Sequence, residues 1–126
     1  MSKFQMKTIL VVEDEPAYQR ALSEKFKYEG YDVFIAQNGE EGLAMALEKH
    51  PDIIITDLLM PKMDGIEMTK KLREDDWGKK AKMIVLTNVT DFSKMQEVMQ
   101  NDIFVYLPKA DTKIEEVVAK VREMTE

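Results

Sequence analysis

Acidic residues follow directly on two apolar, strand-like stretches of this sequence. Asp57 comes after the β-branched run 53–56, and the acidic triplet 13–15 comes after the apolar run 9–12. The carboxyl ends of neighbouring parallel strands meet at one edge of a sheet, so three or four of these carboxylates can share one crevice. Like charges that lie so close raise one another's pKa unless a cation joins them. The pattern predicts a divalent metal site, with the chemistry carried out on Asp57.

The segments that must position these acids alternate between strand-like and helix-like patterns along the whole chain. The expected strands are 8–12, 33–36, 53–57, 83–87 and 103–107, and the expected helices are 16–29, 39–50, 64–75, 91–100 and 112–124. Such alternation is typical of a parallel sheet that helices cover on both faces. Five strand–helix units predict a doubly wound α/β fold, in which ligands bind beyond the carboxyl ends of the strands. The residues expected on that rim are Glu13, Asp14, Asp57, Thr87 and the segment after Leu107.

Local signals mark where the helices begin. Pro16 suits the first turn of the first helix. Asp64 with Glu67, and Thr112 with Glu115, have the spacing of capping pairs at the starts of two later helices. The side chains expected on the buried faces of the helices are Leu22, Phe26, Leu43, Ala46, Leu47, Ile114, Val117, Val118 and Val121.

The bulk composition disfavours several classes of protein. The 126 residues suit one domain, and 44% hydrophobic with 33% charged residues is ordinary globular composition. The net charge of −6 argues against nonspecific nucleic-acid binding, which needs cations against phosphate. The chain has no cysteine, which excludes a disulfide framework and a thiolate metal site. No apolar run is long enough for a membrane span and the start carries no secretion signal, so a cytoplasmic protein is expected.

Four short motifs stand in the expected strand contexts. They are Val-Val-Glu13-Asp14-Glu15, Asp57 with Met60-Pro61-x-Met63-Asp64-Gly65, Val-Leu-Thr87, and Tyr106-Leu-x-Lys109. Together and in this order they resemble the receiver domain of bacterial two-component response regulators, in particular the chemotaxis-regulator type. The resemblance implies a flavodoxin-like (βα)5 fold with strand order 2-1-3-4-5. It also implies a receiver domain over residues 7–126 after an N-terminal tail over residues 1–6.

The resemblance assigns the acids to a magnesium-dependent phosphoacceptor site. Asp57 would be the nucleophile that takes a phosphoryl group as an acyl phosphate. Asp14 and Asp57 would ligate Mg²⁺ directly. Glu13 would act through a water molecule and Leu59 through its backbone carbonyl.

The resemblance also assigns residues to the transferred group and to the switch. Lys109 would neutralise the phosphoryl oxygens, and Thr87 would offer its hydroxyl from the opposite side. Tyr106 would rotate inward behind Thr87 once the charge of the phosphoryl group is added. The protein would then be a signalling phosphoacceptor rather than an enzyme, although it would assist its own phosphoryl transfer and dephosphorylation.

The expected partners follow from the same resemblance. A histidine kinase or a histidine phosphotransfer protein would donate the phosphoryl group. A downstream effector or output domain would bind the face of the fourth helix, fifth strand and fifth helix, and a homodimer is a further form that the family allows. Phe92, Met95 and Met99 form an apolar stripe on the fourth helix, for which core packing is favoured over a partner-binding patch. The chain is expected to be a stand-alone receiver or part of a longer regulator, without direct nucleic-acid or membrane contact.

Four positions depart from the family pattern. Ala110 follows Lys109 where the family usually has proline, which leaves the bond between them open as cis or trans; a cis bond would cost about 2.5–4 kcal/mol. Asn101 replaces a glycine before the fifth strand, in a turn that asparagine tolerates. Asn88 stands where alanine or glycine is usual. Leu59 places an apolar side chain where the family tunes dephosphorylation.

Three other functions compete with a phosphorylatable receiver. A pseudo-receiver would keep the fold as a protein-interaction module; the intact acids and Lys109 argue against it, while Ala110 and Asn88 leave it open. A haloacid-dehalogenase-like phosphatase would need a second aspartate two residues after Asp57, where Leu59 stands. A flavodoxin-like nucleotide binder is disfavoured because the acidic loop after the first strand would repel phosphate.

Two aromatic residues have no expected part in this site. His50 precedes Pro51 at a helix end and is interpreted as structural, with a charge that suits a helix C-terminus. Trp77 is expected on the rim opposite Asp57. Its fluorescence should therefore respond weakly to magnesium.

Overall fold

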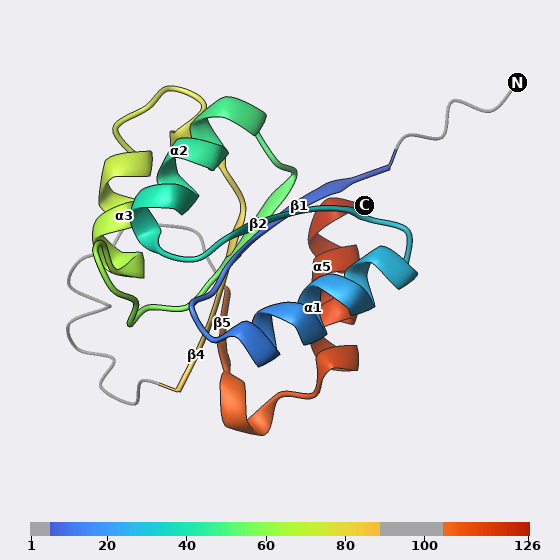
Figure 1. Cartoon of the computed structure of the whole chain (residues 1–126). Helices are drawn as coiled ribbons and strands as arrows, with labels where there is room; N and C mark the ends of the chain where they lie inside the picture. Colours follow the sequence, from blue (N-terminus) through green and yellow to red (C-terminus); the bar gives the residue numbers. More distant parts are fainter. Residues whose placement is uncertain (1–5, 89–104) are drawn as a thin grey trace, which may run out of the picture.

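A five-stranded parallel sheet forms the centre of the molecule. The computed structural model describes residues 6–88 and 105–126 (Figure 1). The strands are β1 (Thr8–Val12), β2 (Asp32–Ala36), β3 (Ile53–Thr56), β4 (Met83–Thr87) and β5 (Val105–Pro108). Their order in the sheet is β2-β1-β3-β4-β5, all parallel. The doubly wound sheet in the order 2-1-3-4-5 is thus confirmed.

Helices lie on both faces of the sheet. The α-helices among the described residues are α1 (Pro16–Tyr28), α2 (Gly39–Lys49), α3 (Gly65–Leu72) and α5 (Ile114–Thr125). Two short 3-10 helices, η1 (Gly78–Lys80) and η2 (Lys109–Asp111), join the larger elements. Helices α2 and α3 cover one face, while α1 and α5 cover the other (Figure 1). The expected helix 91–100 with Phe92, Met95 and Met99, the turn at Asn101, the beginning of the fifth strand and most of the tail 1–6 lie outside the described residues.

The strands at the centre of the sheet are buried on both faces. Successive residues of β1 point to opposite sides, so Ile9 and Val11 join the core under α1 and α5, whereas Leu10 and Val12 join the core under α2 and α3. Every residue of β3 and β4 is buried. This apolar platform fixes the carboxyl ends of β1, β3 and β4, where the sequence predicts the site.

Most of the predicted helix signals are confirmed. Pro16 begins α1, Leu22 and Phe26 are buried beneath it, and Gly30 follows the helix with φ +95°, a conformation that glycine adopts without strain. The Asp64 carboxylate accepts a hydrogen bond from the backbone N–H of residue 67 at 2.8 Å and caps α3. Helix α3 ends at Leu72, three residues before the expected end.

The predicted start of the last helix is wrong by two residues. Helix α5 begins at Ile114, and the Glu116 carboxylate accepts from the backbone N–H of Lys113 at 2.9 Å. Thr112 has extended backbone angles because η2 occupies the chain just before it, so the Thr112–Glu115 pair does not cap the helix. The buried stripe of this helix holds as expected at Val117, Val118 and Val121, while Ile114 is half-buried.

The expected burial of Leu47 is also wrong. Its side chain is 38% exposed, and the buried residues of α2 are Gly39, Gly42 and Ala46, with Leu43 half-buried. A Cβ at Gly42 would lie 2.9 Å from the Val12 methyl groups, so α2 approaches β1 most closely along its small residues. Leu47 is one position, or about 100°, further round the helix than Ala46, and it therefore turns toward solvent.

His50 and Trp77 stack at the edge of the sheet opposite the carboxyl ends of the strands. Their ring centroids are 4.3 Å apart and the ring planes differ by 6°. His50 ends α2 in the left-handed conformation (φ 47°), just before β3 begins, and Trp77 precedes η1 and β4. Both rings therefore belong to the amino-terminal edge, which places Trp77 on the opposite rim as expected.

This placement makes Trp77 a reporter of its own edge of the sheet. Saturating Mg²⁺ should change the Trp77 fluorescence less than the substitution His50→Ala does, because the imidazole is in direct contact with the indole and the acidic cluster lies at the far edge. Emission spectra of both proteins with and without Mg²⁺ test the prediction. A magnesium response larger than the His50→Ala effect would contradict it.

Candidate functional site

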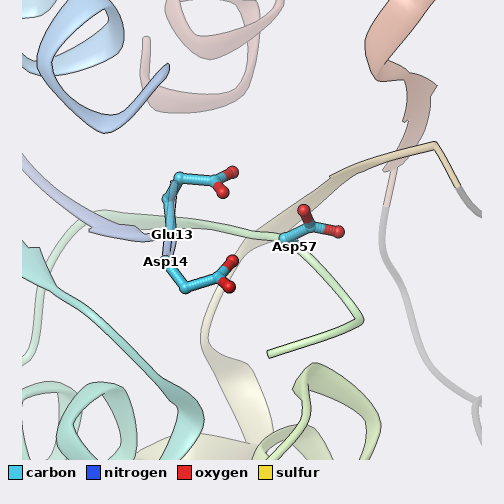
Figure 2. Close-up of side chains that lie close together, drawn as sticks. All are labelled: Glu13, Asp14 and Asp57. Atoms are coloured by element: carbon cyan, nitrogen blue, oxygen red, sulfur yellow. The ribbon is translucent and has the colours of Figure 1, made fainter. Parts of the chain in front are cut away.

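Three carboxylates converge just beyond the carboxyl ends of two neighbouring strands. Strands β1 and β3 are paired with Val12 opposite Thr56, so the residues that follow each strand face one another. The backbone N–H of Asp57 donates to the Val12 carbonyl at 3.2 Å, which extends this pairing by one residue. Carboxylate oxygens of Glu13, Asp14 and Asp57 lie within 4.8 Å of one another (Figure 2). The structure brings together the three acids that the sequence singled out.

Lys109 reaches this cluster from the end of β5. Its Nζ atom lies 2.8 Å from Asp57 Oδ2, 2.9 Å from Glu13 Oε1 and 3.0 Å from Glu15 Oε1. The lysine is only 9% exposed, so it is not a solvated surface residue. Burial by itself lowers the pKa of this lysine, but its hydrogen bonds to Asp57, Glu13 and Glu15 outweigh burial and raise the pKa above the usual value. Lys109 is therefore a fixed positive charge at neutral pH.

Glu13 is the most deeply buried acid of the cluster. Its side chain is 3% exposed, and burial raises the pKa of its carboxyl, while the hydrogen bonds from Lys109 and from the Glu15 backbone N–H lower it. The Gln19 side-chain amide donates to the Glu13 carbonyl at 2.8 Å and braces the turn into α1. The carboxylates of Glu13, Glu15 and Asp57 thus share the single ammonium group of Lys109. The surplus of negative charge favours a further cation, and oxygen ligands of this kind suit Mg²⁺.

The loop between β3 and α3 fixes the orientation of Asp57. The backbone N–H of Leu58 donates to Asp57 Oδ1 at 2.6 Å, and this leaves Oδ2 for the lysine. The N–H of Gly65 donates to the Leu58 carbonyl at 2.7 Å and closes the loop. A Cβ at Gly65 would lie 2.2 Å from the carbonyl oxygen of Asp57, so only glycine permits this close approach. Packing of the loop thereby sets the position of the Asp57 carboxylate.

The remaining predicted site residues have less direct evidence. Thr87 ends β4, is buried, and pairs in register with Pro108 beside Lys109. Tyr106 is half-buried on β5, and burial followed by the negative charge of Asp111 raises the pKa of its hydroxyl. The Leu59 side chain is 70% exposed next to the site. The hydroxyl donor role of Thr87, the switch role of Tyr106 and the metal-binding carbonyl of Leu59 stay predictions.

Two residues of the cluster were missed as site residues by the sequence analysis. Glu15 was interpreted only as part of the acidic triplet, yet it is the third carboxylate on Lys109. Tyr18 was not singled out, and its ring centroid lies 4.5 Å from the Lys109 Nζ atom. Their spacing of three residues is the signal that could have found them, because Glu15 is the N-cap residue of α1, Tyr18 is the third residue of the helix, and side chains at these two positions lie close together.

The departure at Ala110 does not distort the described backbone. No described residue has a cis peptide bond, so the bond between Lys109 and Ala110 is trans, the outcome left open by the sequence. Asn88 is exposed directly after β4. The lysine reaches the cluster from η2, with Pro108 before it and Ala110 after it.

The fold and this set of residues match a family of signalling domains. The family model of the response regulator receiver domain matches residues 9–122, and the chain belongs to that family. Response regulator MprA of Mycolicibacterium vanbaalenii is 33% identical over 92% of this chain and 49% of its own length. The DNA-binding dual master transcriptional regulator RpaA of Synechocystis is 32% identical over 94% of this chain and 49% of its own length.

Solved structures agree with this assignment. Chemotaxis response regulator CheY4 of Vibrio cholerae superposes with a TM-score of 0.85 at 29% identity, covering 95% of this chain and 99% of that one. Response regulator protein TrrA of Thermotoga maritima, in complex with Mg(2+)-BeF, has a TM-score of 0.78 at 33% identity and covers 94% and 99% of the two chains.

The chain spans about half the length, or less, of the curated relatives that it matches. Among the residues that the structure describes, no helix is both long and apolar enough to cross a membrane.

Proposed function

We propose that this chain accepts a phosphoryl group on Asp57 from a histidine kinase or a histidine phosphotransfer protein and changes conformation for downstream signalling. The observation that carries the proposal is the contact of Lys109 with Asp57 inside a surplus of carboxylates. A lone strand-end aspartate is commonly a cap or a solvated turn residue. Here Asp57 is 9% exposed and lies against a buried ammonium, an arrangement suited to charge that develops during phosphoryl transfer.

The transfer forms one bond and breaks another. A carboxylate oxygen of Asp57 attacks the phosphorus of a phosphohistidine and forms an acyl phosphate. The phosphorus–nitrogen bond of the donor breaks, and its electron pair returns to the imidazole. Lys109 stands 2.8 Å from Oδ2 and is placed to neutralise the oxygens of the transferred group. The Leu58 N–H holds Oδ1 and keeps the carboxylate oriented throughout.

The acidic cluster fits magnesium by the chemistry of its donors. Asp14 and Asp57 would hold Mg²⁺ directly, Glu13 through water and Leu59 through its carbonyl, and the ion would neutralise phosphate charge. The similar protein TrrA was solved in complex with Mg(2+)-BeF, which supports the choice of metal. Carboxylate donors without cysteine or histidine also favour a hard cation over a thiophilic one.

The proposal extends to the switch and to its partners. Thr87 moves toward the phosphoryl group and Tyr106 turns inward, which alters the face that the helix expected from the sequence at 91–100 would share with β5 and α5. An effector or output domain binds that face. We take residues 7–126 as the receiver domain after a tail over 1–6, a division supported by the family match over 9–122. We also propose a cytoplasmic location, where a histidine kinase or a histidine phosphotransfer protein would donate the phosphoryl group.

Intact-mass measurement tests the proposed function. The protein is incubated with Mg²⁺ and phosphoramidate, beside Asp57→Asn and the control Asp76→Asn, whose side chain is on the surface. The wild type and the control should gain the mass of one phosphoryl group, whereas Asp57→Asn should gain none. If the wild type gains no phosphoryl group, the result would favour a pseudo-receiver instead. Continuous release of phosphate from a small substrate would favour a phosphatase.

A further inference from the structure

The ring of Tyr18 lies beneath the ammonium group of Lys109. Tyr18 belongs to the first turn of α1, and its ring centroid is 4.5 Å from the Lys109 Nζ atom. The same ring packs against the core cluster between the sheet and helices α1 and α5. A side chain held by the core on one side is a rigid surface for whatever touches its other side.

The ring completes the surroundings of the ammonium. A lysine ammonium has three donor hydrogens, and Asp57, Glu13 and Glu15 offer three acceptors. These three acceptors satisfy all three donors, so the remaining side of the ammonium needs no hydrogen bond. The Tyr18 ring covers that side with a face of negative potential and excludes water from it. Electrostatic attraction between the ammonium and the carboxylates is stronger where water is excluded.

The tyrosine hydroxyl is buried as well. Among residues 6–88 and 105–126 it finds no hydrogen-bond partner, although its ring remains in contact with the lysine. Burial raises the pKa of this hydroxyl, and the nearby positive charge of Lys109 lowers it by less. The phenol is therefore neutral at pH 7, and its ring acts on the lysine as an uncharged aromatic surface.

We propose that Tyr18 is a positioning residue for phosphoryl transfer, whose ring face holds the Lys109 ammonium at the Asp57 carboxylate. The proposal rests on the proposed function of Asp57 and adds to it the group that fixes the lysine. During the transfer, negative charge appears on the phosphoryl oxygens next to the Asp57 carboxylate, and the Lys109 ammonium must move with it. A ring on one side confines that movement to a small arc next to Asp57 and prevents the ammonium from swinging into solvent with Glu15, which is largely exposed.

Rates of phosphorylation test the role of the ring. With Mg²⁺ and phosphoramidate, Tyr18→Leu should be phosphorylated about fivefold more slowly than the wild type, the factor expected from the loss of one cation–π contact. Tyr18→Phe keeps the ring face and should remain close to the wild-type rate. In a Lys109→Gln background the change Tyr18→Leu should have no further effect, because the two residues act as one unit.

The outcomes separate this inference from the proposed function. If the wild type takes up no phosphoryl group, the proposed function fails and the positioning role fails with it. If the wild type is phosphorylated and Tyr18→Leu is equally fast, only the positioning role is overturned. A Tyr18→Phe protein as slow as Tyr18→Leu would also overturn it, because the hydroxyl and not the ring would then be the acting group.

A spectroscopic measurement keeps the test independent of how well Tyr18→Leu folds. In the wild type and in Tyr18→Phe, NMR signals of the Lys109 ε-methylene protons should be shifted upfield by the ring current, because the ammonium lies over the ring. Unshifted ε-methylene signals in the folded wild type would show that the contact is absent and would overturn the proposal.

Discussion

Replacing Lys109 with methionine is expected to destabilise the metal-free protein by about 3 kcal/mol, the usual effect of removing one partner from a buried ion pair. The methionine keeps most of the volume but removes the charge that Asp57, Glu13 and Glu15 share. Glu13 then stays buried without a counter-charge, because its side chain is only 3% exposed. Urea unfolding, followed by circular dichroism without metal, measures the loss.

Magnesium should restore much of that stability, since a divalent cation would neutralise the same carboxylates. The difference between the variant and the wild type should therefore shrink as Mg²⁺ is added. The control Lys79→Met removes a largely exposed lysine, 3.8 Å from Asp76, and should change the free energy of unfolding by less than about 0.5 kcal/mol. Equal stability of Lys109→Met and wild type without metal would show that the cluster does not depend on its lysine.

The pH dependence of this difference has a definite sign. The folded-state pKa of Lys109 is raised above that of the unfolded chain, where lysine has a pKa of about 10.4. The stabilisation from its charge is therefore fully present below about pH 10.4 and is lost only as the pH rises through the higher folded-state value. The stability gap between wild type and Lys109→Met should stay level from neutral to mildly alkaline pH. A gap that closes before ordinary lysines titrate would contradict the raised pKa.

The apolar periodicity of the chain was sufficient to predict the sheet and the rim that carries the site. The continuous run 53–56 and the run 9–12 are buried on both faces, which only a central parallel strand explains, and this placed Asp57 beside Glu13 and Asp14. Which strand ends lie side by side depends only on the order of the strands in the sheet. The alternation of strands and helices along the chain predicts that order, and so it also predicts which residues share the rim.

The apolar pattern could not predict contacts that depend on how closely a helix packs on the sheet or on which distant side chains touch. Leu47 fits an amphipathic pattern. However, α2 packs closely on Val12 through the small residue Gly42, and in this orientation the Leu47 side chain faces solvent. Tyr18 and Glu15 contact Lys109 across more than ninety residues of sequence. Their spacing at the start of α1 pairs them with each other, but it does not reveal the lysine as their common partner. The start of α5 was also predicted wrongly. The 3-10 helix η2 ends at Asp111, just before the predicted start, and α5 begins only at Ile114.

Replacing Gly65 with alanine is expected to destabilise the protein by about 3 kcal/mol, at the upper end for overpacking of a rigid site. The new Cβ would lie 2.2 Å from the Asp57 carbonyl oxygen and 3.1 Å from the Leu58 Cα. Both are backbone atoms, so no side-chain rotation relieves the clash and the loop that carries Asp57 must move. Misplacement of a reacting group by about 1 Å can cost about 100-fold in rate. Phosphorylation at Asp57 with phosphoramidate should therefore slow by at least about tenfold.

Gly78→Ala separates the effect on the site from the effect on stability. Its Cβ would lie 1.9 Å from the Leu72 carbonyl oxygen, an equally severe clash, but at the opposite edge of the sheet beside Trp77. Both variants should unfold at lower urea concentration, while only Gly65→Ala should be phosphorylated slowly when both are folded. Equal rates in the two variants would mean that the loop relaxes without displacing Asp57. A slow Gly65→Ala beside a wild-type rate in Gly78→Ala would tie the position of Asp57, and not stability in general, to phosphoryl transfer.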